Sequence, residues 1–326
     1  MYDCHNRQIN YLRVSVTDRC NFRCAYCMPE QGVKLLTHNE ILSYEELLRV
    51  IRIVSRRGVS KIRLTGGEPL VRKGIVRFVQ SISELEGITD LSMTTNASLL
   101  AGMADKLKAA GLTRVNISMD TIVPERFRQI TRGGNIADTL NGIDAALAAG
   151  LTPVKLNVVL TDIITDRDLV YFVDLVHREQ ISVRFIEYMP IGDNQVGAGP
   201  SIEEIKAKIN SLGKGTLKPV LDIYGNGPAK YFSLPKAQGS FGFITPMSEH
   251  FCGMCNRLRL TADGKFKPCL LSNQEIDVRS ALRNGATDEQ IAELFYSAIA
   301  EKPQGHTLAK SQPDKRFFRK MSQIGG

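Results

Sequence analysis

The stretch RVSVTDRCNFRCAYCMPE, residues 13–30, decides how the rest of the chain is interpreted. It begins with the alternation of a strand and then places Cys20, Cys24 and Cys27 close together. Three thiolates can hold a soft metal centre, but four ligands usually hold a [4Fe-4S] cluster or a structural zinc ion. A cluster held by three cysteines leaves one iron open to another ligand. This open coordination position on the cluster, rather than the cluster itself, indicates a function in binding a ligand.

Two simpler interpretations of the cysteines are weaker. A zinc site needs a fourth ligand nearby, and the next histidine, His38, is remote from Cys27. A disulfide framework is typical of small secreted domains, whereas this chain has 326 residues and only 7 cysteines. An iron-sulfur site is therefore favoured.

An aromatic residue, Tyr26, directly precedes Cys27. The run resembles the Cys-x3-Cys-x-aromatic-Cys signature of the radical S-adenosylmethionine (SAM) superfamily. The resemblance implies that Cys20, Cys24 and Cys27 hold a [4Fe-4S] cluster. The open iron of such a cluster is expected to bind the amino and carboxylate groups of SAM.

The composition is that of an ordinary globular protein, with 43% hydrophobic and 23% charged residues. No apolar run approaches the length of about 20 residues that a membrane span needs, and the N-terminus lacks the apolar core of a signal peptide. We therefore expect a cytoplasmic protein with no membrane partner. The net charge of +8 suits a polyanion, either nucleic acid or a phosphate-rich substrate.

Strands and helices alternate along the first two thirds of the chain, which predicts a parallel sheet covered by helices. Ser43 and Glu46 form a possible capping box at the start of the first helix, and Gly58 is placed to end it. The predicted helices include 44–57 and 74–86, with later ones ending near Gly111 and Gly150. The predicted strands are 11–17, 61–65, 91–95, 114–118, 154–160 and 183–187.

Residue alternation in the first five strands indicates one apolar face and one polar face. In the first strand Leu12 and Val14 oppose Arg13, and in the second Ile62 and Leu64 oppose Arg63. A parallel sheet covered on both faces is normally apolar on both, so we expect the polar faces to line a wet interior. The predicted fold is α/β, an incomplete (βα)6 TIM-like barrel of the radical SAM type with a smaller C-terminal iron-sulfur domain. The alternative is a one-sided sheet exposed to water.

The sequence TGGEPL, residues 65–70, follows the second predicted strand. Gly66 and Gly67 allow the backbone to approach a ligand, and Glu68 is held extended by the proline after it. Alone this is an ordinary turn. Following the cysteine run, it resembles the loop that binds the SAM amino group in radical SAM enzymes.

A second group of three cysteines lies in FCGMCNRLRLTADGKFKPCL, residues 251–270. Cys252, Cys255 and Cys269 could hold a second open cluster, or a zinc ion with His250 as the fourth ligand. Arg257 and Arg259 alternate along an extended segment, which places both on one face suited to phosphate or a purine edge, unless they are a surface pair. The Asp-Gly pair at 263–264 predicts the turn that returns Cys269 to the other cysteines.

Both cysteine patterns, CNRLRLTADGKFKPCL and the terminal Gly325–Gly326 together resemble the MoaA family, the radical SAM GTP 3′,8-cyclases of molybdenum cofactor biosynthesis. The likeness runs nearly from end to end. It implies two [4Fe-4S] clusters, with the second binding the guanine of GTP through its open iron. It also implies that the Gly325–Gly326 tail reaches into the active site. The positions that match SAM contacts are Tyr26, Gly67, Ser118 and Met189, and those that match GTP contacts are Arg13, Arg63, Thr94, Lys155, Arg257 and Arg259.

The resemblance implies a radical reaction without a side-chain nucleophile. SAM would give a 5′-deoxyadenosyl radical that takes the 3′ hydrogen of GTP, and the ribose carbon would then close a ring on C8 of guanine. The implied partners are a reductant protein such as flavodoxin or ferredoxin and a downstream cyclic pyranopterin monophosphate synthase, with a homodimer as a further expectation. We expect a radical SAM barrel over residues 1–217 and a second-cluster domain over residues 218–326.

Three loops depart from the family pattern. Residues 3–7, DCHNR, replace an aromatic-Gly-Arg approach and leave Cys4 as a free thiol, Ala97 stands where glycine is common, and residues 161–168 lack Gly-x-Asn. Two alternatives stay open. One is another radical SAM enzyme with an auxiliary cluster, such as a peptide maturase. The other is a metal-binding RNA-interaction protein, which the scarcity of aromatic residues, 7% of the chain, disfavours, so we expect no nucleic-acid partner.

Overall fold

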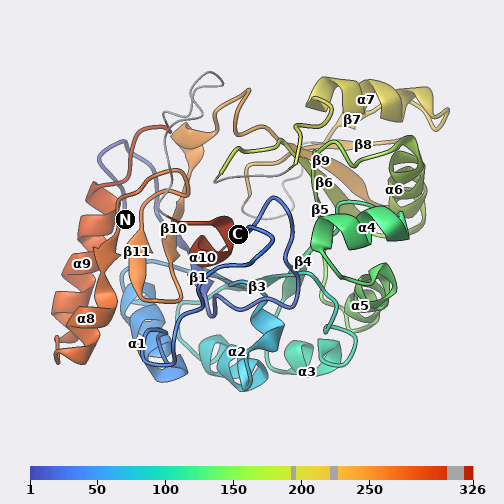
Figure 1. The fold of residues 1–326 in the computed structure, drawn as a ribbon. Helices are drawn as coiled ribbons and strands as arrows, with labels where there is room; N and C mark the ends of the chain where they lie inside the picture. The colour runs from blue at the N-terminus through green and yellow to red at the C-terminus, as the bar shows by residue number, and fades with distance from the viewer. Residues whose placement is uncertain (192–195, 221–226, 307–318, 326) are drawn as a thin grey trace.

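The computed structural model describes residues 1–191, 196–220, 227–306 and 319–325. Its twelve strands form one sheet in the order β12-β11-β10-β1-β2-β3-β4-β5-β6-β9-β8-β7 (Figure 1). The strands are β1 (Tyr11–Ser15), β2 (Lys61–Thr65), β3 (Asp90–Thr95), β4 (Arg114–Ser118), β5 (Val154–Val159), β6 (Ile181–Ile186), β7 (Lys218–Pro219), β8 (Lys230–Ser233), β9 (Ser240–Ile244), β10 (Arg257–Leu260), β11 (Lys265–Lys267) and β12 (Ile276–Asp277).

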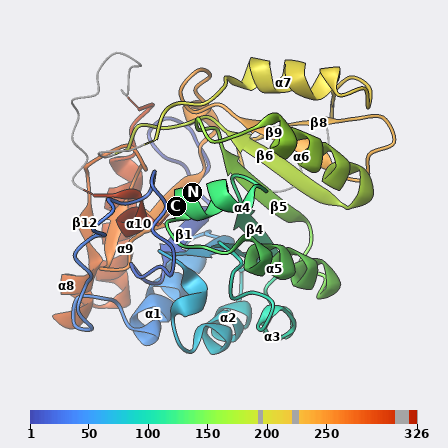
Figure 2. The same ribbon diagram turned by 45° about the vertical axis from the view of Figure 1, so that its right-hand side comes forward.

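Helices cover the outer face of this curved sheet, and the inner face is turned toward the C-terminus of the chain (Figures 1 and 2). The helices are α1 (Tyr44–Ser55), α2 (Ile75–Ser83), α3 (Ala104–Ala109), α4 (Pro124–Thr131), α5 (Ile136–Ala148), α6 (Asp166–Arg178), α7 (Ile202–Ser211), α8 (Val278–Arg283), α9 (Asp288–Ala300) and α10 (Met321–Ile324), with 3-10 turns η1 (Pro69–Val71) and η2 (Cys252–Met254).

The six strands β1–β6 are parallel and follow one another in sequence order, which confirms the incomplete (βα)6 barrel. The later part of the chain extends both of its edges. Strand β10 pairs in parallel with β1, and β9 pairs in parallel with β6. Among the described residues no ladder joins β12 to β7, so the sheet remains open. The predicted domain boundary at residue 217/218 stays a prediction, since strands from both sides of it share this sheet.

The predicted alternation of apolar and polar faces is confirmed. Leu12, Val14, Ile62 and Leu64 are fully buried in the core beneath the helices. The next residues along the strands point to the inside, where Arg13 pairs in register with Arg63 of β2 and with Arg259 of β10. The interior wall is therefore polar because every second strand residue is polar.

The sequence predicted where the first helix begins more accurately than it predicted where the helices and strands end. The capping box of Ser43 and Glu46 is present, and Gly58 has a φ of 96°. Helix α1 ends at Ser55 rather than residue 57, and α2 spans Ile75–Ser83 rather than 74–86. Strand β1 ends at Ser15, before the cysteine loop, and β6 begins two residues earlier than predicted, at Ile181.

Two of the departures from the family pattern occupy left-handed backbone positions. Asn6 has a φ of 64° and Ala97 a φ of 62°, a conformation that glycine adopts without steric cost and alanine does not. Ala97 is fully buried, and a Cβ atom on Gly142 of α5 would collide with its carbonyl oxygen. Cys4 is an exposed free thiol, as predicted.

Candidate active site

The C-terminal ends of the strands open on one cavity of about 330 Å³. Every cysteine of both groups lines it, although the groups are more than 200 residues apart in sequence. Of the other predicted site residues, those on the wall are Arg13, Tyr26, Arg63, Gly67, Thr94, Ser118, Met189, Arg257 and Arg259. The two cysteine groups therefore face one chamber rather than opposite sides of the molecule.

The first cysteine group lies on the loop after β1. This loop is held against the end of α4, where the amide of Ala25 donates to the Ile130 carbonyl at 2.8 Å. Burial raises the pKa of Cys20 to about 11, with a further contribution from the Glu68 carboxylate, and that of Cys27 to about 12, with a further contribution from Cys20. Burial and the charges of Cys27, Asp120 and Cys20 likewise raise the pKa of Cys24. Buried thiols that repel one another as thiolates need a cation, and a metal centre supplies one while displacing their protons.

The second cysteine group is assembled by a hairpin. Cys252 and Cys255 precede β10, and Cys269 follows β11, which returns antiparallel to β10 through the predicted turn at Gly264. Burial opposes ionisation of Cys255, but the charges of Arg257 and Lys302 lower its pKa to about 6. This group therefore differs electrostatically from the first.

The spacing of the cysteines fits a cluster better than a single ion. Sulfur ligands of one zinc ion lie about 3.8 Å apart, as Zn–S bonds of about 2.3 Å in a tetrahedron require. Among the described residues, the one group of three potential ligands within 4.8 Å of one another is His250, Cys252 and His306. Neither cysteine trio forms such a close group, which disfavours a single ion held by the three cysteines alone.

The loop after β2 brings its backbone against the cysteine loop. A Cβ atom on Gly67 would collide with the carbonyl of Arg19, so only glycine fits this position. Glu68 is extended, as predicted, and buried. It accepts hydrogen bonds from Thr95 Oγ1 and the Asn96 amide, both at 2.7 Å, while burial raises its pKa to about 7. Glu68 thus ties the loops after β2 and β3 together.

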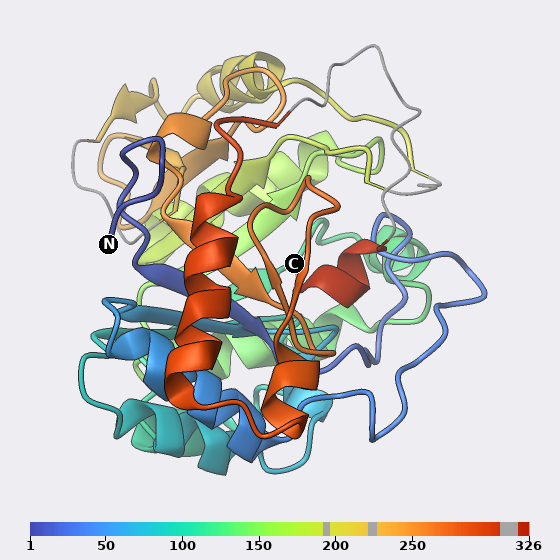
Figure 3. The ribbon, with the colours of Figure 1, turned by 90° about the vertical axis from the view of Figure 1, so that its left-hand side faces the viewer.

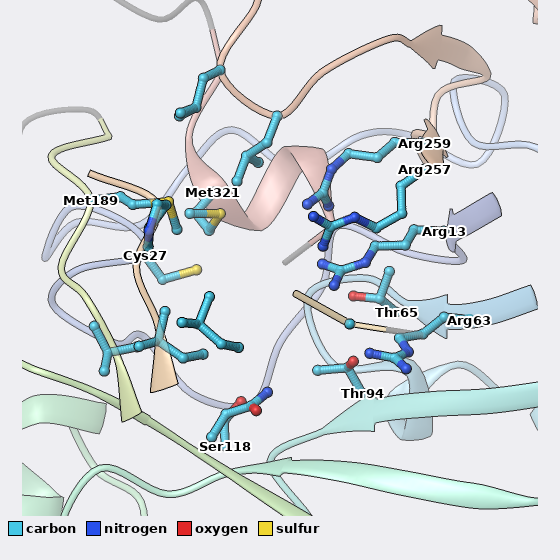
Figure 4. Close-up of a pocket in the computed structure, with 18 of the residues that line it drawn as sticks. Arg13, Cys27, Arg63, Thr65, Thr94, Ser118, Met189, Arg257, Arg259 and Met321 are labelled. Atoms are coloured by element: carbon cyan, nitrogen blue, oxygen red, sulfur yellow. The ribbon is translucent and has the colours of Figure 1, made fainter. Parts of the chain in front are cut away.

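Four arginines form a basic wall opposite Cys27. Figure 4 shows Arg13, Arg63, Arg257 and Arg259 on one side of the pocket and Cys27 with Met189 on the other. Burial, together with the charges of its neighbours, lowers the pKa of Arg63 to about 9. No carboxylate of a described residue forms an ion pair with Arg63 or Arg259.

Buried guanidiniums without carboxylate partners are costly, and an anionic ligand relieves that cost. Strand β10 lies between β1 and β11, so Arg257 and Arg259 are not a pair on a surface edge. The basic wall therefore fits a polyanion.

Lys155 does not line the cavity. Its ammonium lies over the ring of Tyr231 at 5.7 Å, deeper in the interior, and its register partners are Asn116 and Ser182. Burial and the surrounding arginines lower its pKa to about 6. Sequence reasoning missed Arg184, which lines the cavity and donates to Asn157 Oδ1 at 2.6 Å. The alternation of the strand SVRFI, which predicted Arg63 in β2, was the signal available for it.

The end of the chain enters the barrel. Helix α10 lies within the curve of the open sheet in Figure 1, and Figure 3 shows this dark red helix beside the orange strands of the β10–β11 hairpin. Gly325 is buried, and its carbonyl oxygen accepts a hydrogen bond from Arg259. Arg319 anchors the segment through Asp263 at 2.8 Å and Glu275 at 2.5 Å. Gly326 lies outside the described residues.

Three other groups escaped sequence reasoning. Asp120 accepts a hydrogen bond from Tyr26 Oη at 2.8 Å, and burial raises its pKa to about 6. Lys302 donates to the carbonyls of Arg257 and Pro268 at 2.7 and 3.0 Å. His306 also lines the cavity. Asp120 lies two residues beyond the end of β4, in phase with the polar residues of that strand, which was a usable signal. Lys302 and His306 follow a helix and carry no local signal.

Comparison with known proteins identifies the family. The family model of the radical SAM superfamily matches residues 14–176, and that of Molybdenum Cofactor Synthesis C matches residues 181–308. The chain is 52% identical over 330 residues to the GTP 3′,8-cyclase of Heliobacterium modesticaldum and 50% identical over 328 residues to that of Moorella thermoacetica, covering all of both chains. The chain belongs to the GTP 3′,8-cyclase family.

Solved structures with little sequence similarity share the fold of this GTP 3′,8-cyclase family member. Streptococcus suis SuiB bound to its precursor peptide SuiA aligns with a TM-score of 0.63 at 13% identity, over 92% of this chain and 67% of that one. SuiB bound to S-adenosylmethionine aligns with a TM-score of 0.59 at 14% identity, over 82% of this chain and 62% of that one.

Family membership confirms the expected fold and the radical SAM class, with the [4Fe-4S] cluster and SAM that this class implies. It also decides against the peptide-maturase and RNA-binding alternatives. Within the described part of the chain, no helix combines the length and apolar character needed to cross a membrane.

Proposed function

We propose that the two cysteine groups of this GTP 3′,8-cyclase each hold a [4Fe-4S] cluster, one for SAM and one for GTP. The activity itself, the first step of molybdenum cofactor biosynthesis, follows from the family. What supports the division of labour is one observation: six cysteines and a basic wall share a single cavity. Cys20, Cys24 and Cys27 would hold the first cluster, and Cys252, Cys255 and Cys269 the second. When bound and reduced, the first cluster and SAM supply a 5′-deoxyadenosyl radical.

SAM is assigned to the side of the cavity formed by the loops after β1, β2 and β6. Gly67 lets the backbone approach, and Tyr26 is fixed by its hydrogen bond to Asp120. Ser118 ends β4 below these loops, and Met189 lies near Cys27 in Figure 4. Together they would hold SAM with its reactive carbon toward the centre of the cavity.

GTP is assigned to the opposite side. Arg13, Arg63, Arg257 and Arg259 would neutralise its triphosphate, since guanidiniums bind phosphate oxygens in pairs. Thr94 lies beside them and would accept or donate a hydrogen bond. Lys155 would act from beneath the wall, where the negative charge of the triphosphate would favour its protonated form. The guanine would then reach the second cysteine group, which places the ribose between the two centres.

The tail is proposed to complete the GTP side. The carbonyl oxygen of Gly325 already accepts a hydrogen bond from the Arg259 guanidinium. A Cβ atom on Gly325 would lie 2.9 Å from the Cβ atom of Ser15, so a side chain does not fit at this position. Gly325 and Gly326 would hold Arg259 in place and exclude water from the radical. Excluding water and fixing the reacting atoms are the protein's contributions, since no side chain acts as a nucleophile.

The proposal is tested with deuterated substrate. Anaerobically reconstituted, reduced protein is incubated with SAM and GTP deuterated at C3′. The expected products are an isomer of GTP with a new retention time and 5′-deoxyadenosine carrying one deuterium. Cys255→Ser is expected to keep slow SAM cleavage without GTP turnover, whereas Cys24→Ser loses both. Equal loss of SAM cleavage in both variants, or unlabelled 5′-deoxyadenosine, would contradict the separate roles.

The remaining partners are proposed from the resemblance alone. A flavodoxin or ferredoxin would deliver the electron, a cyclic pyranopterin monophosphate synthase would consume the product, and two copies of the chain would form a homodimer. Reduction assays with purified flavodoxin test the electron donor, and gel filtration tests the homodimer.

A further inference from the structure

Two histidines flank one cysteine of the second group. His250, Cys252 and His306 have ligand atoms within 4.8 Å of one another, and they form the one such group among the described residues. His250 is exposed, whereas Cys252 and His306 are partly buried. Neither Cys255 nor Cys269 belongs to this close group. The arrangement is separate from the wider spacing of the three cysteines.

The N-terminal segment holds this group together. The Arg7 guanidinium donates to the Cys252 carbonyl at 2.9 Å and to the Pro303 carbonyl at 2.9 Å, so it joins the cysteine loop to the segment that carries His306. Arg7 is itself fixed by a buried ion pair with Asp3 at 2.6 Å. The backbone at Gly305 then packs beside Cys252, where an added Cβ atom would lie 3.8 Å from the cysteine Cβ. Tertiary contacts therefore fix the position of the backbone that carries His306.

The ring of His306 is held by a backbone carbonyl. Its Nε2 lies 2.8 Å from the Pro246 carbonyl oxygen, a contact in which Nε2 carries the proton and donates. Metal-binding histidines characteristically donate one ring N–H to a carbonyl in this way. Nδ1 of His306 is buried and has no hydrogen-bond partner among the described residues, which is unfavourable for a polar atom. The second imidazole is adjacent, with His250 Nδ1 at 3.1 Å from His306 Nε2.

We propose that His250, Cys252 and His306 bind a single zinc-like divalent ion when the second cysteine group holds no cluster. Two imidazoles and one thiolate are a ligand set that zinc favours, with water in the fourth position. The exposed side chain of His250 gives the ion a route from solvent. Because Cys252 belongs to both ligand sets, the zinc ion and the second cluster exclude each other. The site goes beyond the proposed function and does not depend on cyclase activity.

The site is tested in the full-length, reduced, cluster-free protein. Cobalt(II), a spectroscopic substitute for zinc, is titrated under nitrogen, and zinc affinity is measured by competition with a chromophoric chelator. We expect one equivalent with tetrahedral d–d absorption and a thiolate-to-cobalt charge-transfer band. His250→Ala, His306→Ala and Cys252→Ser should each weaken binding of this equivalent by about tenfold or more. His38→Ala, which changes an exposed histidine elsewhere, is the matched control.

Two further variants separate this site from a zinc site built on the three cysteines. Cys255→Ser and Cys269→Ser should retain the equivalent, because neither sulfur belongs to the close group. Loss of binding in these two variants, or unchanged binding in both histidine variants, would overturn the proposal. Circular dichroism checks folding. If a variant is unstable, the zinc-induced rise in melting temperature, expected in the wild type and absent in His306→Gln, provides the second readout.

Discussion

Replacing Lys155 with methionine is expected to stabilise the protein in the absence of substrate. Lys155 is 2% exposed, and burial together with nearby arginines lowers its pKa from 10.5 to about 6. The folded chain therefore binds this proton less tightly than the unfolded chain does. With the folded-state pKa depressed, the lysine destabilises the fold below pH 10.5, and stability is regained as pH rises from about 6 to about 10.5.

The magnitude follows from the shift. One pKa unit corresponds to about 1.4 kcal/mol. At pH 7 the protonation of Lys155 in the unfolded chain lowers the free energy of unfolding by about 3.5 pKa units, or ~5 kcal/mol. At pH 9 the same effect is about 1.5 pKa units, or ~2 kcal/mol. Methionine has a similar length and no charge, although it gives up the cation–π contact with Tyr231. The gain in unfolding free energy from Lys155→Met should therefore be several kcal/mol at pH 7 and about 3 kcal/mol smaller at pH 9.

Urea-induced unfolding of the reduced, cluster-free protein at pH 7 and pH 9 measures this difference. Lys106→Met on α3, which removes an exposed lysine, is the matched control and should change little at either pH. A Lys155→Met protein that is no more stable than the wild type, or whose gain is equal at both pH values, would refute the electrostatic account. Unchanged GTP affinity in the stabilised variant would instead remove Lys155 from the proposed GTP site.

Three further changes probe the tail and the backbone of the barrel. Arg319→Gln removes both ion pairs of the C-terminal segment, so the amides of residues 322–325 should exchange hydrogen faster by mass spectrometry while the core strands stay protected. Gly142→Ala should destabilise by about 1–3 kcal/mol in thermal unfolding, because its methyl group meets a backbone carbonyl, whereas Gly102→Ala, with no atom within 4 Å of the added carbon, should not. Glu68 has a folded pKa of about 7 against 4.5, so its contribution to stability is lost as pH rises between those values; relative to Glu68→Gln, the wild type should lose about 2–3 kcal/mol between pH 5 and pH 8.

The inner wall could be predicted from the sequence because strand geometry has a fixed period of two. The alternation that placed Arg13 and Arg63 inside is a local property, and it needs no knowledge of the rest of the fold. Arg184 obeys the same rule in β6. The alternation does not indicate how far along a strand the cavity lies. It correctly places Lys155 on the inner face of β5, but the residue of this strand that lines the cavity is Asn157, two positions further on.

The contacts of the chain ends could not be predicted in this way. Arg7 contacts the carbonyls of Pro303 and Gln304, in the segment after α9 that leads to His306, and no periodicity in the sequence indicates such a contact. The positions of β10 beside β1 and of β9 beside β6, at the two ends of the six barrel strands, are equally non-local. The close group of His250, Cys252 and His306 therefore emerged only from the structure, although His250 had been noticed as a possible ligand.

The position of β10 beside β1 also bears on how the chain is made. During synthesis on the ribosome, the first strand has no neighbour on one side until residues 257–260 have emerged, by which time the strands β2–β6 are complete. A nascent chain stalled before that point exposes an unpaired strand edge, which is prone to pairing with other chains. Shortened products of this gene should for that reason be found in inclusion bodies and with chaperones, even when the barrel strands β1–β6 are intact.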